Sequence, residues 1–130
     1  MLFRVVCYAR IVPDASKSRR EMLQEFVAAN PTDAFARYGL AMECAKADDD
    51  AAAENHFRAL LSAHPDYLYG YFHYGQLLVK LGRGAEAQET FRQGIAAAKK
   101  KGDAKALSEL EAALEEAVAS GPEASGVASG

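Results

Sequence analysis

Cysteine is scarce in this sequence, and the patterns that usually carry catalytic chemistry are absent. Cys7 and Cys44 are the only cysteines, and they stand in dissimilar contexts. Two isolated thiols fit a reducing compartment better than a disulfide scaffold, so we expect a cytoplasmic protein with free cysteines. No C-x-x-C or G-x-S-x-G pattern occurs, and the three histidines share no close spacing. We therefore expect a protein that is not an enzyme and that binds neither a metal nor a cofactor.

A large charge of either sign is also absent, because 15 basic and 18 acidic residues leave a net charge of -3. This balance argues against nucleic acid as the partner. The lysine run at residues 99–101 is too short to attract an anionic membrane surface, and it is better explained as cations at the negative end of a helix dipole. The three aspartates at residues 48–50 lack the glycine and glutamate of a calcium loop, so we interpret them as caps of a helix start.

The first 15 residues, MLFRVVCYARIVPDA, differ from the rest because they favour a β conformation. Arg4 and Arg10 interrupt their apolar run before it reaches the length of a signal-peptide core, so we expect no secretion signal. A lone strand would have no partner for its backbone groups. We expect an unordered arm at residues 1–15, or a start codon placed too early; the alternative is a segment that covers exposed helix surface. Residues 120–130 are expected to form a flexible tail.

Half of the residues are hydrophobic, with alanine prominent among them, which predicts a helical domain with a thin core at residues 16–119. Capping residues ahead of apolar stripes, and Gly or Pro after them, mark the helix ends. The first helix follows the capping side chains of residues 14–18 and ends at Asn30. Pro31 stands near the first position of the second helix, which ends at about Lys46. Four further helices are predicted at about residues 50–63, 67–81, 84–100 and 103–119.

Residues 67–98 contain the full pattern of a helical hairpin. The first helix carries four residues at offsets of three, four and seven, which places them on one face: Tyr71, Tyr74, Gly75 and Leu78. On the second helix, small Ala87 precedes bulky Phe91 by one turn. Because Gly75 lacks a side chain, we expect the second helix to approach it closely, with the bulky residue opposite the small ones.

The same pattern recurs upstream. Its residues there are Phe35, Tyr38, Gly39 and Met42 on the first helix, and Ala53, Phe57 and Pro65 on and after the second. Both copies resemble the tetratricopeptide repeat, in which W-x-x-L-G-x-x-Y is followed by A-x-x-x-F and Pro with a period of about 34 residues. Gly39 and Gly75 are 36 residues apart, so we expect the excess to lie in the turn at 47–50. The resemblance covers residues 32–99 and implies an all-α, right-handed solenoid of helical hairpins, closed by a capping helix at 103–119.

In proteins similar to these repeats, the first helix of each hairpin lines a concave groove. Carried over position by position, the resemblance implies a groove formed by Asp33, Ala36, Arg37, Leu40, Glu43 and Cys44 from the first copy and by Tyr69, Phe72, His73, Gln76, Val79 and Lys80 from the second. We expect partner contacts from Arg37, Leu40, Glu43, Tyr69, Phe72, His73, Gln76 and Lys80. The aromatic side chains suit peptide binding, unless the C-terminal helix or the N-terminal arm packs on them. Ala36 and Leu40 stand where carboxylate-clamp domains have Lys and Asn, so we expect no grip on a terminal carboxylate.

The resemblance implies protein or peptide binding by an adaptor or small scaffold without catalytic activity. The alternative is self-association as a homodimer. Two repeats are fewer than the roughly three that make a stable solenoid, so an uncovered end could pair with a second copy. Neither nucleic acid nor a membrane is an expected partner.

Overall fold

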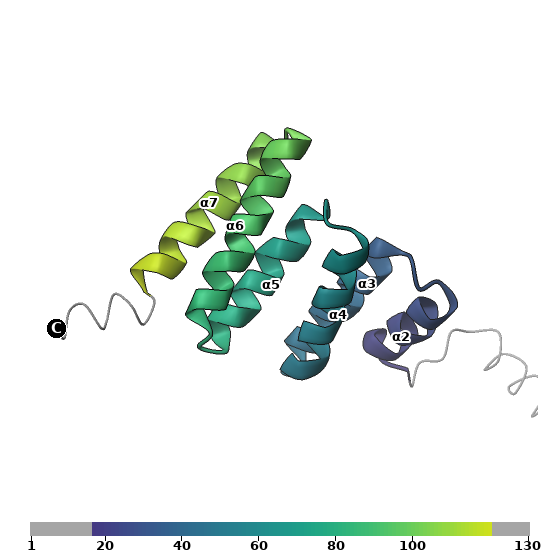
Figure 1. Cartoon of the computed structure of the whole chain (residues 1–130). Coiled ribbons are helices and arrows are strands. Elements are labelled where there is room, and N and C mark those ends of the chain that lie inside the picture. The colour runs from purple at the N-terminus through teal and green to yellow at the C-terminus, as the bar shows by residue number, and fades with distance from the viewer. Residues whose placement is uncertain (1–16, 121–130) are drawn as a thin grey trace, which may run out of the picture.

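The computed structural model describes residues 17–120, and this part of the chain consists of helices joined by short turns (Figure 1). The helices are α2 (Arg19–Ala29), α3 (Ala34–Lys46), α4 (Asp50–Ala63), α5 (Leu68–Lys80), α6 (Gly84–Lys101) and α7 (Ala104–Ala119). The predicted all-α fold of six helices is confirmed within the described residues. The unordered arm at 1–15 and almost all of the tail at 120–130 lie outside them, so both stay predictions.

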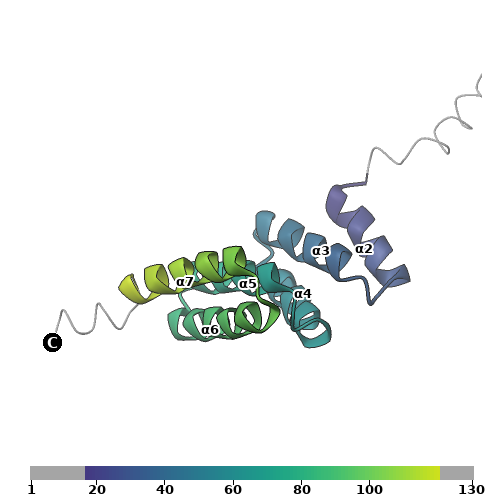
Figure 2. The same cartoon turned by 90° about the horizontal axis from the view of Figure 1, so that it is seen from above.

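The helices form two hairpins flanked by two single helices. α3 packs on α4 and α5 packs on α6, while α2 packs on α3, and α7 packs mainly on α6 and also on α5. Figure 2 shows α3, α5 and α7 along one side of the molecule, with α4 and α6 along the other. This arrangement is the predicted solenoid of helical hairpins, and α7 is the helix that covers its last hairpin.

Side-chain caps explain where several helices begin. Ser18 and Glu21 form a capping box before α2, each side chain accepting a hydrogen bond from the backbone amide of the other at 3.1 Å. Three more helices start at an aspartate that accepts a hydrogen bond from the backbone amide three residues later: Asp33 for α3, Asp49 for α4 and Asp103 for α7. The capping interpretation of the aspartate run is therefore confirmed at its middle residue. Pro31 was expected near the first position of α3, but it lies in the preceding turn.

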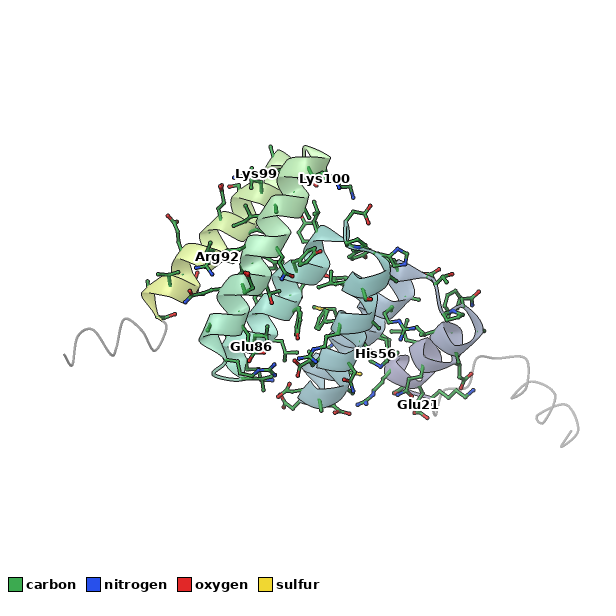
Figure 3. The ribbon with its side chains drawn as sticks, in the orientation of Figure 1. Glu21, His56, Glu86, Arg92, Lys99 and Lys100 are labelled. Atoms are coloured by element: carbon green, nitrogen blue, oxygen red, sulfur yellow. The ribbon has the colours of Figure 1, made fainter. Side chains whose placement is uncertain are left out.

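The lysine run ends a helix, as predicted. Lys99, Lys100 and Lys101 form the last turn of α6, and Figure 3 shows the first two of them at that end. Gly102 follows in the left-handed conformation with a φ of 77° and donates its backbone amide to carbonyl oxygens of the last turn.

The structural repeat is 34 residues long, not 36. Equivalent helices begin 34 residues apart, at Ala34 and Leu68 for α3 and α5, and at Asp50 and Gly84 for α4 and α6. The turns agree with this register, because Asp48 and Gly82 occupy equivalent positions and both have a positive φ, of 61° and 76°. The excess residues expected in the turn at 47–50 are therefore not there.

This period changes which residue of α3 corresponds to Gly75. The equivalent residue is Ala41, which is fully buried, and not Gly39. A Cβ on Gly39 would make only an ordinary contact with Leu23 of α2, at 3.6 Å. The face assigned to α3 from the sequence is consequently wrong by two positions. Phe35, expected to pack between helices, has 74% of its surface exposed.

In the second hairpin the predicted packing is confirmed. All six residues of its pattern are buried: Tyr71, Tyr74, Gly75, Leu78, Ala87 and Phe91. A Cβ on Gly75 would overlap the Phe91 ring, so its missing side chain allows α6 to approach α5. The ring of Phe57 stacks on that of Tyr74 with centroids 5.8 Å apart, which joins the two hairpins. Cys44 is a free cysteine, as expected, and it is buried.

Candidate protein-binding face

The residues expected to form the groove in the first copy do not make an open surface, because half of them are buried and the others are partly buried. Leu40 is 1% exposed and lies in the core with Ala36 and Cys44, so the expectation that Leu40 contacts a partner is wrong. Arg37 reaches toward α4, where it lies 3.4 Å from His56 Nδ1. Glu43 pairs instead with Arg19 of α2 at 3.4 Å. These side chains hold neighbouring helices together because their positions correspond to packing positions of α5.

On α3, the residues equivalent to the outer residues of α5 lie two positions later in the chain than expected from the sequence. We call the outer surface of the row formed by α3, α5 and α7 the A-face. On α3 and α5 it consists of Phe35, Tyr38, Met42, Tyr69, Phe72, His73, Gln76 and Val79. Phe35 and Tyr69 are equivalent across the repeat, as are Tyr38 and Phe72. The A-face therefore repeats a pair of aromatic side chains on successive helices.

Sequence reasoning missed the α3 part of this face although a signal was present. Ala53 and Ala87 are 34 residues apart, as are Phe57 and Phe91. The same spacing applied to the first helices would have aligned Gly75 with Ala41. Glycine at 39 was the misleading residue.

The centre of the A-face is an uncharged aromatic cluster. The centroid of the Tyr38 ring lies 5.2 Å from that of the Tyr67 ring and 5.7 Å from that of the His73 ring. The rings of Phe72 and His73 meet edge to face, with their centroids 5.1 Å apart. Burial raises the pKa of Tyr38. Burial also lowers the pKa of His73, against the opposing effects of Gln76 and Glu109. The imidazole is therefore neutral at pH 7, and the cluster offers apolar surface with hydrogen-bonding groups at its edge.

Helix α7 lies beside this cluster without closing it. Tyr69 donates its hydroxyl to Glu109 Oε1 at 3.5 Å, and Phe72 is half-buried, whereas Gln76 is exposed. A groove of about 420 Å³ remains between α5 and α7, lined mainly by Phe72, Gln76, Val79, Glu109, Ala112, Ala113 and Glu116. The alternative in which the C-terminal helix packs on the aromatic residues therefore describes part of the face only.

Lys80, expected to face a partner, takes part in an ion-pair network at the other end of α5. Its Nζ lies 2.8 Å from Asp48 and 3.3 Å from Asp50, in the segment that starts α4. The lysine therefore ties α5 to the preceding hairpin. It still has about half of its side chain exposed.

A second polar cluster connects α4, α5 and α6. Glu54 accepts hydrogen bonds from Arg83 Nη1 at 2.9 Å and from the Tyr74 hydroxyl at 2.8 Å. Arg83 also donates to Glu86, which Figure 3 shows near the start of α6. These contacts, above all that of Arg83, lower the pKa of Glu54 to about 2 despite its burial. The cluster holds the two hairpins together.

No group of three His, Cys, Asp or Glu side chains within residues 17–120 could hold a metal ion. Nor is any described helix both long and apolar enough to span a membrane.

Comparison with known proteins points to one family. A family model described as tetratricopeptide repeat matches residues 45–114. The crystal structure of a tetratricopeptide repeat domain protein from Salinibacter ruber is 40% identical, with a TM-score of 0.64, over 68% of this chain and 98% of that one. A solution structure of a protein from Bordetella parapertussis is 27% identical, with a TM-score of 0.68, over 78% of this chain and 89% of that one. No curated protein matches the chain.

Proposed function

This chain belongs to the tetratricopeptide repeat family, and on that basis we propose that it is a protein-binding adaptor or small scaffold that holds a segment of its partner on the A-face. Family membership indicates protein partners rather than catalysis. The observation that carries the site assignment is the exposed aromatic pair at equivalent positions of two helices, Phe35 and Tyr69, which are 74% and 36% exposed. Exposed aromatic side chains beside hydrogen-bonding groups are the usual anchors of protein interfaces.

The cytoplasm is the compartment we propose for this activity. Cys44 is a buried free thiol and has no disulfide partner among the described residues. A free cysteine of this kind fits a reducing compartment.

The test compares partner capture by the full chain with capture by a Phe35→Ala/Tyr69→Ala variant. We expect the variant to unfold at nearly the same temperature and to lose the partner, because both side chains are exposed. Phe26→Ala is the matched control, since Phe26 is 48% exposed but lies on α2. A partner retained equally by the double variant and the control would contradict the assignment of the A-face.

Self-association is the second candidate, and a different surface favours it. Met22 and Phe26 of α2 are 45% and 48% exposed at the end of the solenoid. An uncovered apolar helix face could pack against the same face of a second copy. Sedimentation at increasing concentration should then show a dimer, and a Met22→Ser/Phe26→Ser variant should stay monomeric. A chain that is monomeric at all concentrations would exclude this function.

A further inference from the structure

The groove between α5 and α7 has a regular construction. Its α5 wall is formed by Phe72, Gln76 and Val79, which lie at offsets of four and seven residues and so share one helix face. The α7 wall contains Ala112 and Ala113, whose small side chains leave the space between the helices open. The volume of about 420 Å³ falls within the range of ligand clefts. The middle of the groove is therefore suited to a large apolar side chain.

A glutamate stands at each end of the α7 wall. Glu109 and Glu116 are seven residues apart, so they are about 10 Å apart along the helix and only about 20° apart around it. Both line the groove, and no arginine or lysine does. Within residues 17–120 neither carboxylate forms a salt bridge; Glu109 only accepts the long hydrogen bond from Tyr69. An apolar groove with two such carboxylates is complementary to a cationic, apolar ligand.

From this geometry we infer that the groove selects a short partner segment in which a large apolar residue is flanked by arginine or lysine. In a polyproline II conformation, which has three residues per turn and a rise of about 3.1 Å per residue, residues three positions apart lie on the same side of the chain and about 9 Å apart, close to the separation of the two glutamates. The apolar side chain fills the space over Ala112, and each cation pairs with one carboxylate. This inference rests on the proposed function and specifies the chemistry of its partner.

The same helix supplies a matched control for the glutamates. Glu111 and Glu115 are exposed and lie on the other side of α7, away from the groove, beside Ile95 and Leu114. Replacing either pair of glutamates by glutamine changes the net charge by the same amount. The comparison therefore separates local pairing in the groove from general attraction between a cationic peptide and an acidic protein.

The experiment measures binding of three synthetic peptides to the full chain by isothermal titration calorimetry at low salt. The peptides are acetyl-GSRALRGS-amide, its acidic analogue acetyl-GSEALEGS-amide and its glycine analogue acetyl-GSRAGRGS-amide. We expect the first to bind at least about tenfold more tightly than the others, because only it offers both the cations and the apolar side chain. Glu109→Gln/Glu116→Gln should weaken its binding by roughly tenfold, and Glu111→Gln/Glu115→Gln by less than about twofold.

Several results would overturn the inference. They are an absence of binding by the cationic peptide, equal affinity for the acidic analogue, or equal weakening by both glutamine pairs. An Ala112→Trp variant fills the groove at an exposed position and should abolish binding with an unchanged thermal midpoint; undiminished peptide binding would place the peptide elsewhere. The proposed function is judged separately by partner capture. If capture still depends on Phe35 and Tyr69 while the peptides fail, the A-face stands and only the cationic specificity falls.

Discussion

Two glycines of the second hairpin are required for different physical reasons. A Cβ at Gly75 would overlap the Phe91 ring, whereas a Cβ at Gly82 would meet no atom within 4 Å, but Gly82 has a φ of 76°. Gly75→Ala should therefore lower the free energy of unfolding by about 1–3 kcal/mol through overpacking. Gly82→Ala should lower it by about 1 kcal/mol through backbone strain alone. Urea denaturation measures both effects.

A second substitution separates these causes. In a Phe91→Leu background the smaller side chain can move aside, so Gly75→Ala should lower the free energy of unfolding by less than it does in the natural chain. The decrease in the free energy of unfolding caused by Gly82→Ala should stay the same, because a side chain at position 82 would not contact residue 91. An undiminished cost at Gly75 would mean that the ring is not what limits the space there.

At the level of helices, the sequence predicted the second hairpin better than the first. α5 has a glycine at the point of closest approach, and that glycine marks the register without ambiguity. α3 has Ala41 at this point and a glycine two positions earlier, so the visible glycine indicated the wrong register. Alanine and glycine can both serve at a tight helix contact, so the register of α3 follows from the 34-residue spacing of the second helices and from the packing against α4, and not from its glycine. The two end helices could be predicted from caps and apolar stripes, whereas the length of the turn at 47–50 and the place of Pro31 could not.

Gly39→Ala tests this register directly. In the observed register Gly39 lies within a helix, and its new Cβ would meet Leu23 at an ordinary distance of 3.6 Å. The substitution should therefore raise the free energy of unfolding by about 0.5–1 kcal/mol through helix propensity. A register that placed Gly39 against Phe57, as Gly75 lies against Phe91, would instead make it destabilising. The sign of the change in thermal midpoint decides between the two.

Helix α7 has a single large side chain that is fully buried against the last hairpin, which makes the contribution of this helix to stability easy to test. Leu110 is 1% exposed, whereas Leu107 on the same helix is only half-buried. Leu110→Ala should lower the free energy of unfolding by about 2–4 kcal/mol because it leaves a cavity, and Leu107→Ala should cost clearly less. Guanidinium denaturation of both variants checks the order. If both variants lowered the free energy of unfolding by the same small amount, α7 would not be firmly packed on the last hairpin.

For the whole molecule, the proposed binding face depends on features that no single helix displays. The aromatic residues of α5 could be predicted from the repeat pattern alone. The groove beside them needs the placement of α7, because one of its walls consists of alanines of that helix with a glutamate at each end, and these look like ordinary solvent-exposed residues. The aromatic pair on α3 needs the 34-residue register. Sequence reasoning therefore identified the middle of the A-face and missed both of its sides.

The cluster around Glu54 makes the stability of the whole molecule depend on pH. Hydrogen bonding, first from Arg83 and also from Tyr74, lowers the pKa of Glu54 from 4.5 to about 2 in the folded chain. Because the folded pKa lies below the unfolded one, the ionised carboxylate stabilises the fold fully above pH 4.5. This contribution, at most about 3 kcal/mol, is lost as the pH falls from 4.5 to about 2.

Glu54→Gln isolates this effect from the other carboxylates. At pH 7 the variant should be less stable than the natural chain by about 2 kcal/mol, because two charged hydrogen-bond partners, Arg83 and Arg58, lose their acceptor's charge. Below pH 4.5 the difference should shrink, since the natural chain then loses the same charge by protonation. Urea denaturation of both proteins at a series of pH values measures this difference. If the difference in free energy of unfolding between the two proteins stayed constant down to pH 2, Glu54 would stabilise the hairpins by its shape and not by its charge.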